Sequence, residues 1–373
     1  MGSIDTDRLR RLGLYDPDAP DARERLRLLE LVLALGATED ELVERAANER
    51  LGPLALELAM RTSSERVEFG DAASQAGLSI DEAAALWRAL GFPDPRQTKP
   101  RLPADSVEVL RLIAGLGREL FGPEATLALA RVVGGTSARL AQALVDAFRA
   151  EVEMPLLSEG VPYVEIVERF TRLAREDLPA AFAALAVITR QHLVAQASGT
   201  WSAVGGESVA HRDLVIGFSD LVGYTTLSRT LSGTALASLI RRFEGLLGET
   251  VLAERGRIVK LIGDGAMFAC DDAEAACDIG LELCDVFDAA RGTPPVRVGL
   301  AAGSVVALQG DYYGETVNVA ARLVAVAQPS TVAVDEEVRR RAGSRFDFQR
   351  LPAQPLKGLP EAPAYRAKRR EAS

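Results

Sequence analysis

The stretch RIVKLIGDGAMFAC, residues 257–270, decides how the second half of the chain folds. It contains two apolar runs, Arg257–Ile262 and Ala266–Cys270, separated by Gly-Asp-Gly at 263–265. Two strand-like runs joined by a short glycine-containing turn are typical of a β-hairpin. The hairpin would carry the acidic side chain of Asp264 at its tip.

The segments around this hairpin predict a mixed sheet. Leu214–Ser219 before it and Val296–Ala302 after it have the apolar character of strands, and helical patterns run through Leu236–Leu252 and Glu274–Phe287. The order strand, helix, strand, strand, helix, strand is the ferredoxin-like arrangement, a sheet with its helices on one face. The fold by itself identifies no function.

The first two hundred residues follow a helical pattern instead. Apolar residues recur at helical spacing in Arg23–Leu35, Ser106–Leu116 and Ser137–Phe148, the last of which begins with a capping residue. A longer helix is expected over Pro179–Ala197, and strand-like alternation is scarce before residue 210. We therefore predict an all-helical N-terminal domain in an α+β chain.

This change of pattern predicts the domain organisation. Residues 1–197 would form the helical domain, including a linker helix, and residues 198–211, which contain the Gly205-Gly206 pair, would form a flexible linker. Residues 212–373 would form the sheet-containing domain.

Composition narrows the class of protein. The chain has 373 residues, 48% of them hydrophobic and 26% charged, with a net charge of −10. This balance is typical of a soluble globular protein and gives no electrostatic argument for stable binding to nucleic acid. No apolar run approaches the roughly 20 residues that span a bilayer, so we expect a cytoplasmic chain without a membrane span. Cys270, Cys277 and Cys284 are interpreted as small buried residues in a reducing compartment.

Three segments contain the residues suited to chemistry. In residues 217–225, Asp220 ends a strand before a glycine-containing turn, which suits a magnesium-bound polyphosphate. Residues 260–265 place a second carboxylate at the hairpin tip. In residues 311–322, Asn318 and Arg322 are four apart and would share one helix face. Lysine occurs only four times and asparagine twice, so each use of them is informative.

Together, and in this order, the three segments resemble the class III nucleotide cyclases over most of the chain after Arg212. The resemblance implies conversion of ATP to cyclic AMP and pyrophosphate. Asp220 and Asp264 would be metal ligands for two Mg²⁺ or Mn²⁺ ions, Asn318 would orient the ribose, and Arg322 would stabilise the pentavalent phosphate. Further residues expected to bind the substrate are Phe218, Gly223, Tyr224, Thr225 and the triphosphate-binding Lys357.

The choice of base also has a chemical argument. Adenine presents an acceptor at N1 and a donor at N6, and Lys260 offers only donors while an ionised Asp311 offers only acceptors. Guanine reverses these positions and would leave buried polar groups unpaired. The family uses a lysine and an aspartate for adenine at the matching positions, so both arguments indicate ATP. The alternative is that Lys260 is solvated and Asp311 is an ordinary loop residue.

The resemblance further implies a homodimer. In the family the metal carboxylates come from one catalytic domain, whereas the base-reading and transition-state residues come from another. This chain carries both sets in one catalytic domain. A head-to-tail dimer with two equivalent sites is therefore expected.

The N-terminal half resembles, in architecture only, soluble actinobacterial cyclases in which a helical domain restrains the catalytic dimer, some of them in response to pH. A regulatory role is favoured here, and a simple dimerisation module is the alternative. If protons are the signal, His192 and His211 are the available sensors near neutral pH, although either could be an ordinary surface residue. A small-molecule or lipid ligand of this domain stays open.

The sequence leaves two alternative classes of function. Residues 70–80 resemble the turn of a helix-turn-helix motif, which would make the chain a DNA-binding regulator. The following helix, however, begins with Asp81 and Glu82, where a recognition helix would meet a polyanion. A catalytically silent nucleotide-binding protein would have lost a catalytic position, and none is lost here.

Overall fold

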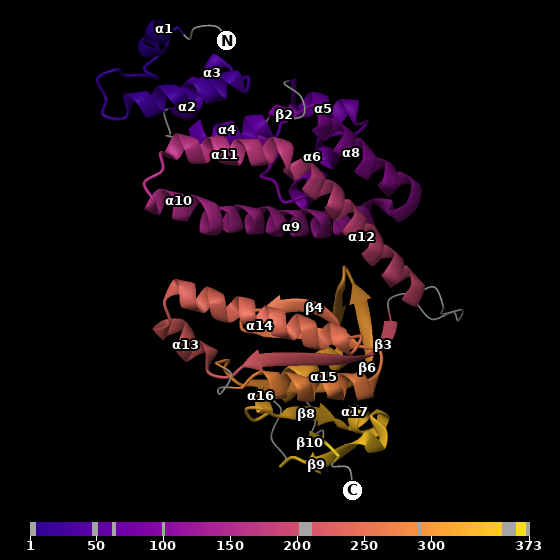
Figure 1. The fold of residues 1–373 in the computed structure, drawn as a ribbon. Coiled ribbons are helices and arrows are strands. Elements are labelled where there is room, and N and C mark those ends of the chain that lie inside the picture. The colour runs from indigo at the N-terminus through magenta and orange to yellow at the C-terminus, as the bar shows by residue number, and fades with distance from the viewer. Residues whose placement is uncertain are drawn as a thin grey trace. The chain divides into compact units, whose positions relative to one another are not determined.

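The computed structural model describes residues 5–46, 51–61, 65–98, 101–200, 211–288, 292–352 and 363–370. The chain forms two compact units, Met1–Val204 and Gly205–Ser373 (Figure 1). Each unit has apolar clusters of its own, so each is described by itself.

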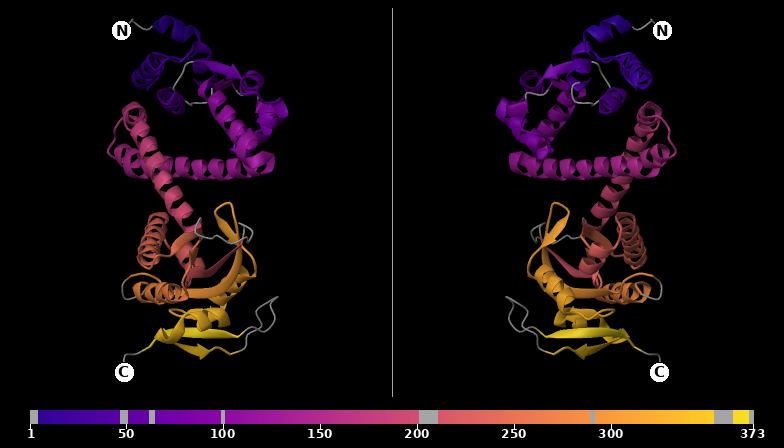
Figure 2. Two further views of the ribbon diagram at one scale, coloured as in Figure 1. Left: turned by 90° about the vertical axis from the view of Figure 1, so that its right-hand side faces the viewer. Right: turned by 90° about the vertical axis from the view of Figure 1, so that its left-hand side faces the viewer.

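The N-terminal unit is helical, as predicted, with one short addition (Figures 1 and 2). Its α-helices are α1 (Thr6–Arg11), α2 (Ala22–Ala34), α3 (Glu39–Ala46), α4 (Leu51–Ala59), α5 (Phe69–Gln75), α6 (Ile80–Ala89), α7 (Pro95–Thr98), α8 (Asp105–Leu116), α9 (Gly122–Phe148), α10 (Met154–Ser158), α11 (Tyr163–Glu176) and α12 (Leu178–Thr200). The addition is an antiparallel pair of strands, β1 (Arg66–Glu68) and β2 (Arg101–Pro103). Strands of three residues are too short to show alternation in a sequence.

Helix α9 is longer than predicted. It begins at Gly122, with a proline in its first turn, and continues unbroken through Ser137, which is therefore no cap. Gly134, inside this helix, makes a close contact with the end of α6. A Cβ atom at Gly134 would lie 2.4 Å from the carbonyl oxygen of Leu90, so α9 can approach the end of α6 only with glycine at this position.

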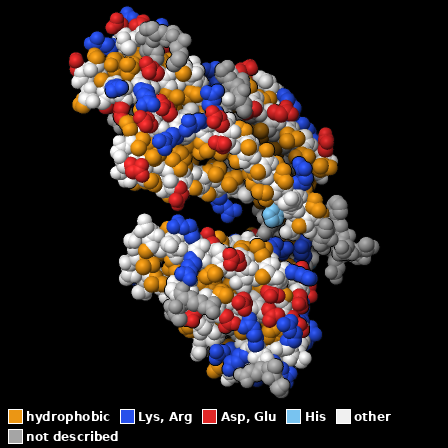
Figure 3. Space-filling view, in the orientation of Figure 1, with side chains coloured by type: hydrophobic (Ala, Val, Ile, Leu, Met, Phe, Trp, Pro, Cys, Tyr) orange, Lys and Arg blue, Asp and Glu red, His pale blue; other side chains and the backbone are white. Residues whose placement is uncertain are grey.

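Helix α12 corrects the expectation that no segment approaches a membrane-spanning length. Leu178–Ala197 is a 20-residue stretch with a mean hydropathy of 1.4, and none of it is buried. Arg190 and His192 interrupt the apolar run, so the stretch does not show as a continuous apolar segment in the sequence. Its mean hydropathy is nevertheless high. Large side chains such as Ile188 and Leu193 are exposed, and Figure 3 shows hydrophobic side chains spread over the surface of this unit. By length and composition the helix could cross a membrane, although one such helix is weak evidence of a span.

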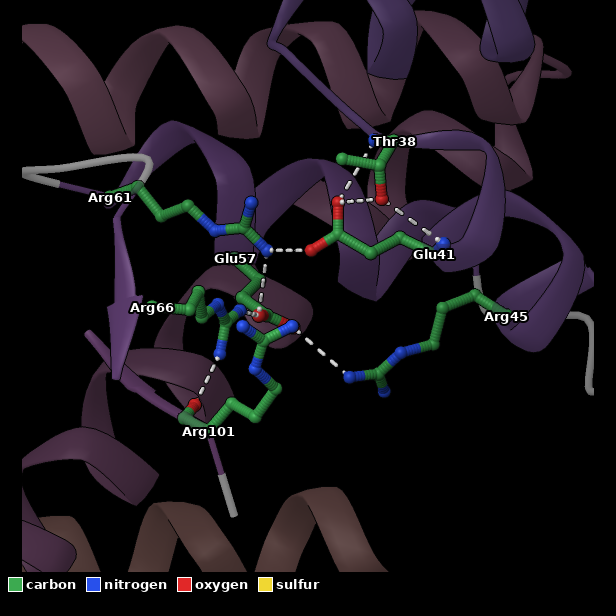
Figure 4. Close-up of polar contacts among 7 residues, drawn as sticks. All are labelled: Thr38, Glu41, Arg45, Glu57, Arg61, Arg66 and Arg101. Atoms are coloured by element: carbon green, nitrogen blue, oxygen red, sulfur yellow. Dashed lines mark hydrogen bonds and ion pairs between the residues drawn. The ribbon is translucent and has the colours of Figure 1, made fainter. Parts of the chain in front are cut away.

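A cluster of charged side chains joins α3, α4 and β1 (Figure 4). Arg61 donates to Glu41 at 2.6 Å and to Glu57 at 3.1 Å, and Arg45 and Arg66 also pair with Glu57. Burial acts to raise the pKa of Glu57, but hydrogen bonds from Arg61 and Arg66 outweigh it, and the pKa is lowered. The carboxylate therefore stays ionised at neutral pH, and the cluster connects three elements that follow one another in the chain.

The C-terminal unit is built on one mixed sheet. Its strands are β3 (His211–Leu221), β4 (Arg257–Ile262), β5 (Gly265–Cys270), β6 (Val296–Leu308), β7 (Asp311–Tyr313), β8 (Val332–Asp335), β9 (Phe346–Arg350) and β10 (Ala364–Arg369). Its α-helices are α13 (Tyr224–Thr230), α14 (Gly233–Ala253), α15 (Ala273–Val286), α16 (Glu315–Val326) and α17 (Glu336–Arg341). The strand order is β4-β5-β3-β6-β8-β10-β9, and β7 pairs with β6. The first four strands confirm the ferredoxin-like prediction.

The helices cover both faces of this sheet, which differs from the expectation of one covered face. Helices α14 and α15 pack with Val215 and Phe268 in one apolar cluster. Helix α16 contributes Ala320 and Leu323 to a second cluster, with Ile216 from the other side of β3. The two core helices therefore share a face as predicted, whereas α16, which follows the core motif, lies on the opposite one.

Candidate active site

Asp220 lies next to the end of the central strand β3. The register pairs it with Gly265 of β5 on one side and with Arg297 of β6 on the other. Its carboxylate oxygen Oδ2 accepts hydrogen bonds from Arg297 Nε at 2.7 Å and Nη2 at 2.5 Å. The strand pairing therefore holds the Asp220 carboxylate where the central strand ends, and the charge of one guanidinium neutralises it.

Asp264 lies beside this carboxylate, at the tip between β4 and β5. Its carbonyl oxygen accepts from the Leu221 amide at 3.0 Å, which fastens the tip to the end of β3. A Cβ atom at Gly265 would lie 2.6 Å from the Ser219 carbonyl oxygen, so this approach requires glycine. Burial raises the pKa of Asp264, and the nearby charge of Asp220 raises it further.

These two carboxylates fit divalent cations that also bind a polyphosphate. Mg²⁺ is commonly held by one or two carboxylates, with substrate phosphates supplying further oxygen ligands. Burial is the main cause of the raised pKa of Asp264 and the charge of Asp220 adds to it, so a bound cation would favour the ionised form of this carboxylate. Among the described residues no group of three or more His, Cys, Asp or Glu side chains is placed to hold a metal ion.

The other predicted residues of the first segment divide between the two faces of the sheet. Phe218 is half-buried on the face that α16 covers, whereas Tyr224 packs against the opposite cluster. Gly223 has a left-handed backbone, with φ of 79°, and Thr225 is exposed in the first turn of α13. Phe218 and Tyr224 therefore lie on opposite faces of the sheet.

Lys260 and Asp311 form a direct ion pair between β4 and β7. The Asp311 Oδ2 atom accepts from Lys260 Nζ, and its Oδ1 atom accepts from the Tyr312 amide at 2.8 Å. Both carboxylate oxygens are therefore held. The two residues are 51 positions apart in the sequence, and the structure brings them together.

Asn318 and Arg322 lie one turn apart on α16, as predicted. Asn318 is exposed, and Arg322 is half-buried. The Nη1 atom of Arg322 is buried without a hydrogen-bond partner in the described part of the chain. Buried donors are usually paired, so this nitrogen is available to an incoming oxyanion.

The predicted residues form separate groups within one catalytic unit. In the described ranges, no hydrogen bond or ion pair joins the carboxylates Asp220 and Asp264 to the Lys260–Asp311 pair or to Arg322. The predicted triphosphate lysine, Lys357, lies outside the described residues. His192 on α12 and His211 at the start of β3 are both exposed.

Sequence reasoning missed Arg297. Besides its bonds to Asp220, its Nη1 atom donates to the carbonyl oxygen of Ala325 at 3.4 Å, so it links the carboxylate to the last turn of α16. The relevant signal is its register position directly opposite Asp220. That position becomes visible only when the order and alignment of the strands are known.

The N-terminal unit offers two further features. Ser79 precedes helix α6 and caps it in a capping box with Glu82, and Asp81 lies in the first turn. This helix end is acidic, so DNA binding has no support beyond the motif itself.

A pocket of about 230 Å³ between α4, α9 and α11 is lined mainly by apolar side chains, including Phe148 and Phe170. A ligand for this unit stays a prediction.

Comparison with known proteins identifies the family of the C-terminal unit. Residues 207–368 match the family model described as the adenylate and guanylate cyclase catalytic domain. An adenylate cyclase from Streptomyces coelicolor is 34% identical over 302 residues, covering 80% of this chain and 78% of that protein. An adenylate cyclase from Streptomyces griseus is 33% identical over 80% of this chain and 74% of its own length.

A pH-sensitive adenylate cyclase from Mycobacterium tuberculosis is 27% identical, covering 86% of this chain and 80% of that protein. The alignments with these relatives extend well beyond the catalytic match, so the likeness includes much of the helical unit. With its ferredoxin-like sheet and paired carboxylates, this chain belongs to the class III adenylate and guanylate cyclase family, alongside the adenylate cyclases of Streptomyces.

Proposed function

We propose that this chain is an adenylyl cyclase that converts ATP to cyclic AMP and pyrophosphate through attack of the ribose 3′-hydroxyl on the α-phosphate. The observation that carries the choice of ATP is the ion pair between Lys260 and Asp311. An ammonium donor beside a carboxylate acceptor complements the N1 and N6 edge of adenine and mismatches guanine. The relatives named adenylate cyclase support the same choice.

Asp220 and Asp264 would hold two Mg²⁺ or Mn²⁺ ions against the triphosphate. Bound metal would lower the pKa of the 3′-hydroxyl and neutralise developing phosphate charge. The chain contributes the position of both carboxylates, fixed by the register of β3 with β5 and by the hydrogen bond from Leu221 to the hairpin tip. Arg297 neutralises Asp220 when no cation is present.

Asn318 and Arg322 would act on the ribose and on the reacting phosphate. Helix α16 is packed onto the sheet through Ala320 and Leu323, which leaves Asn318 exposed. The unpartnered Nη1 atom of Arg322 is a donor held in place before substrate arrives. A donor fixed in advance stabilises charge in the transition state without the cost of reorganisation.

The active enzyme is proposed to be a head-to-tail homodimer. Among the described residues, no hydrogen bond or ion pair joins the carboxylate pair to the base-reading pair, which suits a site completed by residues from a second copy. Each dimer would then contain two equivalent sites, and a lone subunit would have little activity.

Regulation through the N-terminal unit is a further part of the proposal, and a dimerisation module is its alternative. Helix α12 would transmit the state of the helical unit to β3, which starts at His211. If pH is the signal, replacing both His192 and His211 should flatten the pH–activity profile. An unchanged profile in a chain that does respond to pH would exclude them. The proposed location is the cytoplasm.

The test of the function is a side-by-side assay of ATP and GTP with Mn²⁺ or Mg²⁺. We expect cyclic AMP to form from ATP, with cyclic GMP formation from GTP lower by about a hundredfold or more, as expected when a mismatched base leaves polar groups unpaired. Asp220→Asn should abolish product formation while the protein stays folded. Equal use of both nucleotides would contradict the proposed role of Lys260 and Asp311.

A further inference from the structure

The β6–β7 hairpin is tied to β4 by two side-chain pairs. One is the base-reading pair of Lys260 and Asp311, and the other is a hydrogen bond from the Arg257 guanidinium to the Tyr312 hydroxyl. In the sheet, β5 and β3 lie between β4 and β6. The hairpin must therefore pass over the face of the sheet to reach β4. Tyr312 is accordingly buried in the cluster on the face that α16 covers.

A bulge in β4 places both cations on that face. The register pairs Arg257 with Ala269 and Lys260 with Met267, and it shifts between Ile258 and Lys260. Side chains three apart on a regular strand would point to opposite faces. Here one extra residue is inserted, so Arg257 and Lys260 both stand across from residues of the α16 face, Ala269 and Met267. Bulges commonly re-aim a side chain in this way.

Tyr312 links Arg257 to the base-reading pair of Lys260 and Asp311 through hydrogen bonds. The Tyr312 hydroxyl accepts from Arg257, and the Tyr312 amide donates to Asp311 Oδ1 at 2.8 Å. The other oxygen of Asp311 accepts from Lys260. Tyr312 thus contacts Arg257 through its side chain and Asp311 through its backbone amide. Arg257 and Lys260, the two ends of this chain of contacts, both belong to β4.

Arg257 depends on this single acceptor. The Tyr312 hydroxyl is the acceptor that the structure gives its guanidinium, and no carboxylate in the described residues forms an ion pair with it. Burial lowers the pKa of Arg257, and the nearby charge of Arg212 lowers it further. A half-buried cation that loses its acceptor must move toward water. Such a movement would release the side chain of Tyr312.

We propose that Arg257 and Tyr312 are positioning residues for base recognition: they pin the β6–β7 hairpin to β4 and so fix Asp311 against Lys260. This inference rests on the proposed function, because it explains how the adenine-reading pair keeps its geometry. Neither residue touches the reacting atoms. Their loss should therefore weaken the reading of the base and leave the chemical step largely intact.

The test uses the full chain and compares Tyr312→Phe, Arg257→Met and Arg257→Lys with the unaltered protein. The phenylalanine keeps the ring and removes only the hydroxyl. We expect the first two variants to raise the KM for ATP about tenfold with little change in kcat, the pattern of lost binding that does not change in the transition state. The preference for ATP over GTP, measured as the ratio of their kcat/KM values, should also fall about tenfold, and Arg257→Lys should recover part of it.

Matched controls are available in the same unit. Arg339 and Tyr365 form a similar pair, with the guanidinium carbon 5.1 Å from the ring centroid, the distance also found for Arg257 and Tyr312. Arg339→Met and Tyr365→Phe should leave the ATP preference unchanged. The preference is a ratio measured on one preparation, so partial unfolding cancels from it.

The outcomes separate this inference from the proposed function. If the unaltered chain makes cyclic AMP and Tyr312→Phe keeps both its KM and its preference within about twofold, positioning by this pair is wrong and the function stands. If kcat falls with an unchanged preference, the pair is merely structural. If the unaltered chain makes no cyclic AMP, both proposals fail together. Should Arg257→Met not fold, Tyr312→Phe and Arg257→Lys decide.

Discussion

Asp220 and Arg297 face each other directly across two neighbouring strands, and both Nε and Nη2 of the arginine donate to the same carboxylate oxygen, at 2.7 and 2.5 Å. The pair is about one third exposed, with 34% of the arginine side chain and 26% of the aspartate side chain accessible. A cation entering beside Asp220 would compete with this guanidinium. The ion pair therefore gives a way to test metal binding without measuring catalysis.

Replacing Arg297 with glutamine should make the protein more dependent on metal. Without divalent cations we expect the free energy of unfolding to fall by about 1–2 kcal/mol, because Asp220 loses its partner beside Asp264. Added Mn²⁺ should restore more stability in Arg297→Gln than in the unaltered protein. Urea unfolding with a chelator or with Mn²⁺ measures both effects.

Arg369→Gln is the control for this change, because it breaks the more exposed pairs with Asp285 and Glu282. It should show no added response to Mn²⁺. If Arg297→Gln and Arg369→Gln respond equally to the metal, Asp220 is not a metal ligand.

Gly299→Ala should displace the helix that carries Asn318 and Arg322. A Cβ atom at Gly299 would lie 2.2 Å from the Val324 amide nitrogen and 2.6 Å from the Ala320 carbonyl oxygen, both backbone atoms of α16. We expect the free energy of unfolding to fall by about 1–3 kcal/mol, as for an overpacked core. The activity per folded molecule should also fall, because the helix that carries Asn318 and Arg322 is displaced. Gly245→Ala on α14, where an added Cβ meets nothing within 4 Å, is the control. Equal activities per folded molecule would refute the role given to α16.

Complementation tests the shared site. Asp220→Ala and Arg322→Ala should each be inactive in separate homodimers. A mixed dimer would have one site with both defects and one site with neither, so mixing the two variants should restore part of the activity. Activity is measured after mixed dimers have been verified, for instance with two affinity tags. Verified mixed dimers without activity would contradict the head-to-tail arrangement.

Asp335 predicts a pH dependence in the stability of the C-terminal unit. Its carboxylate caps α17 by accepting from the Val338 amide, yet burial raises its pKa to about 6. Because this pKa lies above the unfolded value, the folded state binds the proton more tightly. The resulting stabilisation is fully present below the unfolded pKa and is lost as pH rises through about 6.

Asp335→Asn keeps a good capping side chain and removes this titration. The difference in free energy of unfolding between the unaltered protein and Asp335→Asn should therefore change by about 3 kcal/mol from acid to neutral pH, and the unaltered protein should become less stable relative to the variant as pH rises. Urea unfolding at several pH values measures it. A constant difference would show that Asp335 does not titrate in this range.

Local patterns predicted much of the C-terminal unit. The hairpin, the two core helices and the strands on either side were all visible in the alternation and spacing of apolar residues. The strand β6, however, extends to Leu308, six residues beyond the predicted end at Ala302. Those extra residues lead into the hairpin that brings Asp311 to Lys260. Residues 305–308 are apolar, but Gly303 and Ser304 interrupt the apolar run before them, so the sequence suggested an earlier end.

The remaining features depend on contacts between distant segments. The bulge near Val259, the position of Arg297 opposite Asp220, and the face occupied by α16 all follow from how strands align. A sequence shows that Gly299 is small, but only the packed structure shows that α16 needs the space. Residue type and spacing were enough to select the candidate site residues. Which of those residues contact one another depends on the tertiary packing.

The most direct test of the central claim is cyclic AMP production from ATP with Mn²⁺ or Mg²⁺. The full chain is compared with a chain that starts near Ser208, over about pH 5.5 to 8, where histidine titrates. We predict cyclic AMP from both, and a pH response only in the full chain if the helical unit is a pH sensor. If neither protein makes cyclic AMP while both are folded and dimeric, the assignment as an adenylyl cyclase is wrong, and nucleotide binding without catalysis becomes the better account.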